Sequence, residues 1–186
     1  MTLNIDQGLQ SKAGFRGLRV AAKIVESSLI TSFHLEAADG SALPAFRPGQ
    51  FLVFKIPSGD PKGYVLRNYS LSGSPDDHCH YRISVKREPS AGPGLPVGQG
   101  SNYLHDDVCV GDVLIADGPR GEFVLDEVSD RPVVLLSGGV GLTPMVAMLH
   151  ALAKRSARRA LFLHACENGE VHALRDEVNG LISQRP

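Results

Sequence analysis

Short runs rich in apolar, β-forming residues recur from Leu18 onward, and polar turn signals such as Asp39-Gly40, Pro48-Gly49 and Gly111-Asp112 separate them. The runs are LRVAAKIV (18–25), ITSFHLEA (30–37), QFLVFKI (50–56), VLRNYSLS (65–72), YRISVK (81–86) and DVLIADG (112–118). Many short strands at this spacing predict an antiparallel barrel or sandwich. We therefore expect a β domain over residues 18–128, preceded by an N-terminal arm at 1–17 that shows no clear period.

One segment inside this region has helical character instead. In VGQGSNYLHDDV (97–108), Ser101 suits the N-cap of a helix, and Tyr103 and Leu104 follow it as the first helical residues. A serine hydroxyl at an N-cap accepts a hydrogen bond from a free backbone N–H group of the first turn. We therefore expect a short helix headed by Ser101.

The pattern changes after about Ser129. RPVVLLS (131–137) is a continuous apolar run, typical of a strand buried on both faces, and ALFLHAC (160–166) is a second one. Between them, Val146, Leu149 and Leu152 fall three apart on one helical stripe, with Thr143 as a natural N-cap and Pro144 suited to the first helical position. A further helix is predicted over VHALRDEVNGLI (171–182).

Strand, glycine turn, helix and strand make a βαβ unit. We therefore expect residues 129–186 to be the N-terminal part of an α/β nucleotide-binding domain. A parallel sheet of two strands covers neither both of its faces nor its edges. The sequence thus predicts a second domain that is incomplete or is completed by something else.

Composition excludes several function classes. The 186 residues carry 19 basic and 20 acidic side chains, for a formal charge of −1, which favours neither nucleic acid nor an anionic membrane as partner. The longest apolar run is far too short to span a bilayer, and the first ten residues lack the pattern of a signal peptide. Three cysteines far apart in the sequence fit a reducing, cytoplasmic setting.

The segment GGVGLTP (138–144) has the context of an anion site. It follows an apolar strand and opens a helix, so free backbone N–H groups and the positive helix end face any ligand there. It lacks the lysine of a P-loop and the glycine spacing of the dinucleotide fingerprint. A plain tight turn is the alternative, but the coincidence of strand, glycines, threonine and helix favours phosphate binding.

A second candidate site centres on the strand LRNYSLS. Arg67 and Tyr69 share one strand face and lie roughly 7 Å apart. An arginine beside the Ser101 helix suits a pyrophosphate, and a tyrosine suits a flat aromatic ring. An ion pair for Arg67 and a half-buried strand position for Tyr69 are the better explanation of each residue alone. Together with Ser70, which alternation puts on the opposite face, they favour a ligand site.

Two further features resemble functional sites, but we predict no function for either. His78-Cys79-His80 lies between two strands with no second Cys/His cluster near it, so we predict a turn and no metal site. His105-Asp106 is not matched by a nucleophile elbow of the form G-x-S-x-G, so no catalytic triad is predicted.

At this point the residues resemble the ferredoxin–NADP reductase superfamily. RNYS is similar to its flavin motif and GGVGLTPM to its pyridine-nucleotide motif, and PGQFL, YRISVKRE, GSNYLHD, VGDVL and GPRGEF match in the family's order. SGGVGLTPMVAMLHAL and HACENGEVHALRDEV most resemble the reductase part of flavohaemoglobins and related fused oxidoreductases. The resemblance implies an FAD-binding antiparallel barrel of the Greek-key type, followed by an NAD(P)-binding α/β domain.

The resemblance also implies a function and a site. The protein would be an FAD-dependent NAD(P)H oxidoreductase module whose electrons go to a haem or iron–sulfur partner, of the globin or 2Fe-2S ferredoxin type. Arg67 would hold the FAD pyrophosphate, Tyr69 would pack on the isoalloxazine ring, and Ser70 would be the catalytic position near the flavin N5. The remaining cofactor-binding positions are Asn68, Val85, Lys86, Gly100, Ser101, Gly138, Gly139, Val140, Gly141, Thr143 and Pro144.

The chain departs from the family in its last part. The family's later C-G-P motif and its aromatic or acidic C-terminal segment do not occur in the 186 residues. An FAD-binding fragment without turnover of its own is therefore the alternative to a working reductase. A structural fragment that binds no flavin is a third, weaker interpretation. The residues do not decide between NADH and NADPH.

Overall fold

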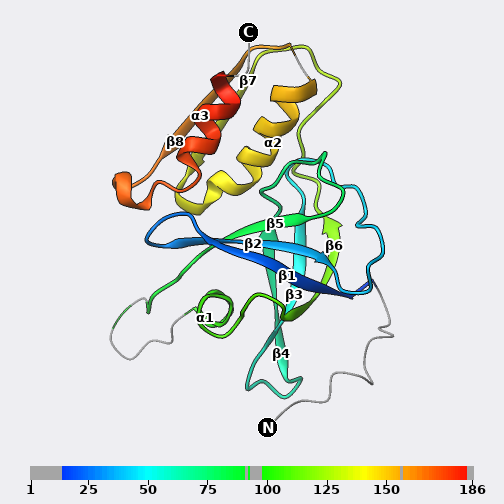
Figure 1. Cartoon of the computed structure of the whole chain (residues 1–186). Helices are drawn as coiled ribbons and strands as arrows, with labels where there is room; N and C mark the ends of the chain where they lie inside the picture. The colour runs from blue at the N-terminus through cyan, green and yellow to red at the C-terminus, as the bar shows by residue number, and fades with distance from the viewer. Residues whose placement is uncertain (1–13, 91, 93–97, 156, 184–186) are drawn as a thin grey trace.

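The structure, a computed structural model, describes residues 14–90, 92, 98–155 and 157–183. Most of the predicted arm, residues 1–13, lies outside the described residues. The N-terminal part is a six-stranded antiparallel sheet in the order β4-β3-β6-β1-β2-β5 (Figure 1). Its strands are β1 (Arg16–Val25), β2 (Ile30–Ala37), β3 (Phe51–Pro57), β4 (Tyr64–Ser70), β5 (Tyr81–Lys86) and β6 (Val113–Arg120). Each agrees with its predicted run to within two residues.

The two edge strands of this sheet, β4 and β5, meet just beyond the end of β4. Leu71 forms an antiparallel bridge with Ile83, and the Ser72 N–H donates to the Arg82 carbonyl over 2.8 Å. The sheet therefore curls into a barrel around Phe33, Leu35, Phe54 and other fully buried side chains. The predicted antiparallel barrel is confirmed.

The short helix α1 (Gln99–Asp106) begins two residues before Ser101, so the predicted cap is wrong. Gly98, in extended backbone conformation, is the N-cap and provides no side-chain bond. The Ser101 hydroxyl lies within the first turn, where it donates to the Gly98 carbonyl over 3.1 Å and accepts the Glu88 N–H over 3.1 Å. The serine therefore ties the helix to the segment after β5 rather than capping it.

The second part is a small α/β unit. Strands β7 (Val133–Gly138) and β8 (Ala160–Ala165) are parallel, and α2 (Leu142–Arg155) connects them after the 3₁₀ turn η2 (Gly139–Gly141). The predicted βαβ arrangement is confirmed, but the cap at Thr143 is wrong. Gly139, at φ 51°, lets the chain start a 3₁₀ turn, and Leu142 N–H already bonds to the carbonyls of Gly139 and Val140. Thr143 and Pro144 are thus the second and third residues of the helix.

The second predicted helix starts later than expected. The chain first forms the 3₁₀ turn η3 (Gly169–Val171), which the Asn168 side chain caps by accepting the N–H groups of Glu170 and Val171. Leu174 then takes a left-handed conformation, at φ 56°, which a continuous helix does not allow. The helix α3 (Arg175–Ser183) begins only after this break.

Both helices lie on one side of the two-stranded sheet, and the opposite side is open (Figure 1). Val134 and Leu136 of β7 are 59% and 68% exposed, and Leu161 and Leu163 of β8 are 52% and 45% exposed. The prediction that the first apolar run is buried on both faces is therefore wrong. In the described part of the chain, no second layer covers these side chains.

Barrel and α/β unit are packed directly on each other. Ala147 of α2 is fully buried in the barrel core, and Ile30 of β2 belongs to the core of the α/β unit. Gly49, at φ 108°, lies against the segment that joins the two, because a Cβ there would collide with the Phe123 carbonyl oxygen. Within the described residues, no helix is both long and apolar enough to traverse a bilayer.

Candidate functional site

Arg67, Tyr69 and Gly100 form a tight cluster between β4 and α1. A Cβ atom added to Gly100 would lie 2.9 Å from Arg67 Cγ and 3.0 Å from Tyr69 Oη, so only glycine allows this approach. Strand alternation predicted that Arg67 and Tyr69 share one face of β4. The structure shows that this face packs against the start of α1.

The Arg67 guanidinium is available to an anion. It is exposed, and its Nη1 donates to the neighbouring Leu66 carbonyl over 2.8 Å. Among the described residues, no carboxylate lies within ion-pair distance of it. The alternative explanation of Arg67 as half of an ion pair thus finds no partner in this part of the chain.

The start of α1 adds backbone donors at the same place. The first bond of its ladder runs from the Asn102 N–H to the Gly98 carbonyl over 3.0 Å. The N–H groups of Gln99, Gly100 and Ser101 precede that ladder and carry the positive end of the helix dipole. A cationic guanidinium next to such a helix end is suited to a phosphate or pyrophosphate.

Tyr69 presents an aromatic ring beside this anion site. Its ring packs edge-on against Phe54 at a centroid distance of 5.7 Å, and the side chain is half-buried. Burial raises the pKa of its hydroxyl to about 12, against the lowering effect of the Arg67 charge. The phenol therefore stays neutral at physiological pH and can serve as a packing surface with a hydrogen-bonding tip.

Asn68 and Ser70 lie on the other face of β4. Pairing with β3 is regular from Tyr64 opposite Pro57 to Ser70 opposite Phe51, without a bulge. Strand alternation therefore keeps both side chains away from the Arg67–Tyr69 face. The Ser70 side chain is half-buried, and no hydrogen bond to its hydroxyl is formed by the described residues.

Val85 and Lys86 end β5 close to the α/β unit. The Val85 side chain is only 1% exposed in the barrel core, and its carbonyl is 2.9 Å from His105 Nε2 of α1. The Val85 side chain therefore faces away from any ligand. Lys86 is half-buried, and its ammonium group lies 3.7 Å from a Glu88 carboxylate oxygen.

A cavity of about 310 Å³ separates the barrel from the glycine turn. Its lining residues come from both parts of the protein and are Leu29, Ile30, Lys86, Gly139, Val140, Ala165, Cys166, Glu167 and Val171. A Cβ added at Gly139 or Gly141 would meet no atom within 4 Å, so the turn borders open space. The cavity lies at the carboxyl ends of β7 and β8, where α/β folds bind ligands.

Lys86, Gly139 and Val140 are predicted site residues, but Leu29, Ile30 and Val171 were not predicted. These three are apolar: Leu29 directly precedes β2, Ile30 is the first residue of β2, and Val171 ends η3. Nothing in their local sequence distinguishes them from core residues. Thr143 is buried, and its hydroxyl donates to the Val140 carbonyl over 3.1 Å, so it supports the turn from behind.

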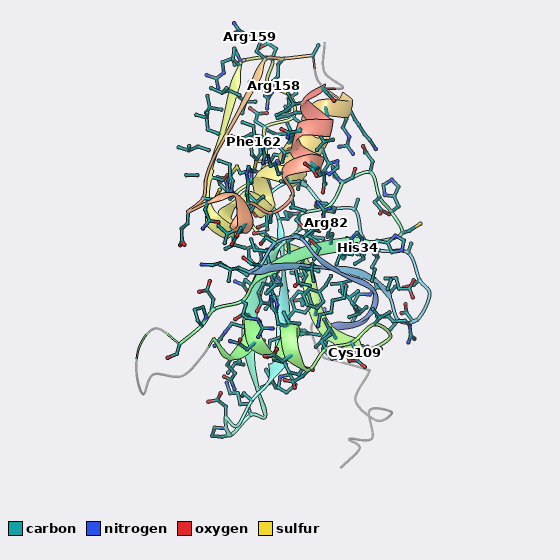
Figure 2. All side chains as sticks on the ribbon, turned by 60° about the vertical axis from the view of Figure 1, so that its left-hand side comes forward. His34, Arg82, Cys109, Arg158, Arg159 and Phe162 are labelled. Carbon is teal, nitrogen blue, oxygen red and sulfur yellow. The ribbon has the colours of Figure 1, made fainter. Side chains whose placement is uncertain are left out.

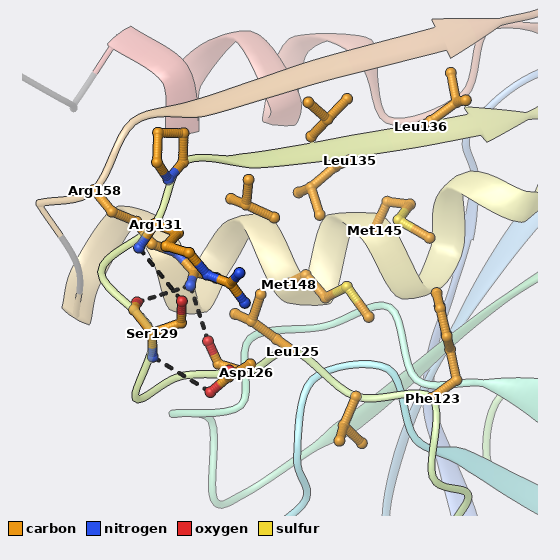
Figure 3. Close-up of a pocket in the computed structure, with 14 residues that line it drawn as sticks. Phe123, Leu125, Asp126, Ser129, Arg131, Leu135, Leu136, Met145, Met148 and Arg158 are labelled. Carbon is orange, nitrogen blue, oxygen red and sulfur yellow. Dashed lines mark hydrogen bonds between the residues drawn. The ribbon is translucent and has the colours of Figure 1, made fainter.

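A larger cavity, of about 480 Å³, lies elsewhere, along the free edge of β7. Met145 and Met148 of α2, Leu135 of β7 and Phe123 of the connecting segment line it (Figure 3). No predicted cofactor-binding residue takes part in it. It is a largely apolar groove, although Asp126, Arg131 and Arg158 also line it. We assign the site to the smaller cavity and the Arg67–Tyr69 cluster, because these hold the residues that the sequence predicts to bind phosphate.

Both parts of the chain are similar to known proteins. Residues 17–125 match the family model of the oxidoreductase FAD-binding domain, and residues 135–186 match that of the oxidoreductase NAD-binding domain. The chain is 50% identical to a flavohemoprotein of Deinococcus radiodurans over 173 residues, which are 92% of the chain and 41% of that protein. A flavohemoprotein of Chromobacterium violaceum is 48% identical over 94% of the chain and 43% of its own length.

Solved structures give the same result. The flavohem-like FAD/NAD-binding domain of nitric oxide dioxygenase from Vibrio cholerae aligns with a TM-score of 0.84 and 40% identity, over 94% of the chain and 71% of that domain. Phthalate dioxygenase reductase aligns with a TM-score of 0.74 and 33% identity, over 89% of the chain and 48% of its own. The chain spans less than half the length of the curated relatives named above.

The family of the chain follows from its fold, the two matching family models and these relatives. It belongs to the oxidoreductase FAD-binding domain family, within the ferredoxin–NADP reductase superfamily, and corresponds to the reductase part of flavohemoproteins.

Proposed function

We propose that this chain is an FAD-dependent NAD(P)H oxidoreductase module that passes electrons from NAD(P)H through FAD to a one-electron acceptor. The observation that carries the proposal is the packing of Arg67, Tyr69 and the first turn of α1 around Gly100. Among the described residues the Arg67 guanidinium has no carboxylate partner, so it and the N–H groups at the start of α1 fit a pyrophosphate. The neutral phenol ring of Tyr69 fits the flat aromatic ring system of FAD.

The residues of the barrel would hold the flavin. Arg67 and the N–H groups of Gly100 and Ser101 bind the pyrophosphate, while Tyr69 packs on the isoalloxazine ring. Backbone groups at Val85 and the Lys86 side chain contact the diphosphate or ribose. Asn68 and Ser70 contact the flavin from the other face of β4, and Ser70 is the catalytic position near N5. The roles of Asn68 and Ser70 are supported by the resemblance to the family alone, since strand alternation points their side chains away from the face that carries Tyr69.

The glycine turn would hold the nicotinamide nucleotide. Gly138, Gly139, Val140 and Gly141 let the ligand approach the backbone, and the N-terminal turn of α2 with Thr143 and Pro144 faces its phosphates. The open space at Gly139 and Gly141 supports this role. When both are bound, the nicotinamide supplies a hydride and the flavin accepts it and releases electrons singly.

The relatives indicate the kind of acceptor. Flavohemoproteins are named for a haem and a flavin, and phthalate dioxygenase reductase is described as transferring electrons from pyridine nucleotides to a [2Fe-2S] centre. We therefore propose a globin or 2Fe-2S ferredoxin domain as redox partner. The three cysteines, which form no disulfide among the described residues, support a reducing compartment such as the cytoplasm.

The test is anaerobic reduction of the FAD-loaded chain. NADH and NADPH are added separately, the flavin absorbance is followed, and ferricyanide then serves as a one-electron acceptor. The proposal predicts bleaching by at least one of the nucleotides and reoxidation by ferricyanide. Bound FAD that keeps its oxidised spectrum with both nucleotides contradicts turnover by this chain.

A second candidate function is an FAD-binding unit that does not turn over alone. The specific observation behind it is the open side of β7 and β8, together with the apolar groove along β7 in Figure 3. An α/β unit with four half-exposed aliphatic residues on one sheet face is poorly covered for a nucleotide-binding domain. This function predicts FAD binding with no nucleotide-dependent bleaching, so the same experiment separates the two candidates.

A further inference from the structure

Arg82 of β5 lies at the junction between the barrel and the α/β unit (Figure 2). Its guanidinium makes a two-point contact with the Glu177 carboxylate of α3, with Nη1 to Oε2 at 2.7 Å and Nη2 to Oε1 at 2.8 Å. The two side chains are only 11% and 25% exposed. This paired geometry fixes both distance and orientation, which a single contact does not.

The same arginine holds the end of the predicted flavin strand. Ser72, two residues beyond the end of β4, accepts at its carbonyl from Arg82 Nη2 over 2.5 Å and at its hydroxyl from Arg82 Nε over 3.2 Å. The Ser72 hydroxyl continues to Ser84 at 2.8 Å and from there to Ser32 at 2.7 Å, in a buried chain of hydroxyls. The Arg82 guanidinium is therefore held by Ser72 of the barrel as well as by Glu177 of the α/β unit.

Glu177 is equally anchored on its own side. His150 of α2 places Nε2 2.5 Å from Glu177 Oε1, so the carboxylate connects α3 and α2 to each other as well as to the barrel. Burial acts to raise the pKa of Glu177, but the hydrogen bonds from His150 and Arg82 outweigh it and lower the pKa to about 2. The carboxylate is thus ionised whenever the protein is near neutral pH.

A second ionic contact crosses the junction but is more exposed. Arg155, at the end of α2, pairs with Asp76 of the β4–β5 loop and with Glu127, and these side chains are 43%, 30% and 35% exposed. Solvent weakens such contacts. The half-buried Arg82–Glu177–His150 contact is therefore the stronger constraint on how the two parts sit.

We propose that Glu177 is a positioning residue, which through Arg82 and Ser72 fixes the nucleotide-binding turn of the α/β unit against the flavin strand of the barrel. The role in catalysis rests on the proposed function, because it concerns the approach of the nicotinamide to the flavin. The mechanical role does not rest on it, since Arg82 contacts Glu177 and Ser72 directly.

Hydrogen exchange measured by mass spectrometry tests the mechanical role in the chain without added ligands. In Glu177→Ala, amides of α2 and α3 should exchange roughly tenfold faster or more, while amides of β1, β3 and β6 should keep their rates. Arg82→Lys keeps the positive charge but loses the two-point geometry, and should show the same pattern more weakly. Asp39→Asn is the matched control, because it removes an ion pair with Arg16 that lies within the barrel.

The catalytic role is read from the FAD-loaded chain. Glu177→Ala should bind FAD as tightly as the wild type. The rate constant of flavin reduction, measured at a saturating concentration of the nucleotide that reduces the wild type, should fall roughly tenfold in this variant and stay unchanged in Asp39→Asn. Two outcomes of the exchange experiment overturn the proposal. In the first, exchange rises equally in the barrel and in the helices in both Glu177→Ala and Arg82→Lys. In the second, exchange rises in neither part of either variant. A wild-type chain that is reduced by neither NADH nor NADPH refutes the proposed function instead, and the exchange data still decide the role of Glu177.

Discussion

Replacing Gly100 by alanine tests the cofactor site with a single methyl group. The new Cβ would lie 2.9 Å from Arg67 Cγ and 3.0 Å from Tyr69 Oη, closer than unbonded atoms normally approach. Arg67 has to swing away, since its exposed side chain is the more mobile of the two. Its side chain then no longer packs beside the first turn of α1.

The expected magnitudes differ between binding and stability. Loss of one charge-assisted hydrogen bond to the pyrophosphate costs about 1.5–3 kcal/mol, so FAD should bind roughly ten- to hundredfold more weakly. Stability should change by less than about 1 kcal/mol, because the better helix propensity of alanine offsets part of the strain. FAD affinity is measured by fluorescence titration, and stability by urea unfolding followed by circular dichroism.

Gly180→Ala is the matched control. Gly180 also lies in a helix, α3, but a Cβ there would meet no atom within 4 Å. This variant should gain up to about 1 kcal/mol of stability and leave FAD affinity unchanged. If Gly100→Ala folds and binds FAD as tightly as the wild type and Gly180→Ala, then Arg67 and Tyr69 do not contact the cofactor.

Three further predictions follow from named contacts. Arg67→Ala should weaken FAD binding by about 1.5–3 kcal/mol in the same titration, and an unchanged dissociation constant would place the phosphates elsewhere. Because the pKa of Glu177 falls from 4.5 when unfolded to about 2 when folded, its contribution is complete above pH 4.5 and is lost as pH falls towards 2. Urea unfolding should therefore lose stability more steeply over this range in the wild type than in Glu177→Gln, and equal slopes would contradict the ionised contact. Leu135→Ala should lower the free energy of unfolding by about 2–5 kcal/mol because Leu135 is 3% exposed. Leu136→Ala should lower it by less than about 1 kcal/mol because Leu136 is 68% exposed. Similar losses in the two variants would mean that something covers the open face of the sheet.

The strands were predictable because their signals are local. Each run of β-forming residues, such as ITSFHLEA, is bounded by its own turn residues, and the barrel followed from their number and spacing. The placement of Arg67 and Tyr69 on one face of β4 was also predictable, because it depends only on alternation along one strand. Their approach to Gly100 was not, because it depends on how α1 packs against β4.

The errors have physical causes that lie outside the local pattern. Ser101 and Thr143 look like caps, but the extended backbone at Gly98 and the left-handed Gly139 start each helix earlier. RPVVLLS reads as buried on both faces because an apolar run does not say whether a second layer exists. Arg82 and Glu177, 95 residues apart, carry no sequence signal at all, because only the packing of α3 on the barrel brings them together.

The central claim is that the barrel holds FAD against Arg67, Tyr69 and α1. Gel filtration of the folded chain after incubation with excess FAD tests it most directly, with the flavin-to-protein ratio of the eluted peak as the readout. The account predicts one FAD per chain for the wild type and a clearly lower ratio for Arg67→Ala. A wild-type peak that shows the circular dichroism of a folded barrel but carries no flavin would contradict it.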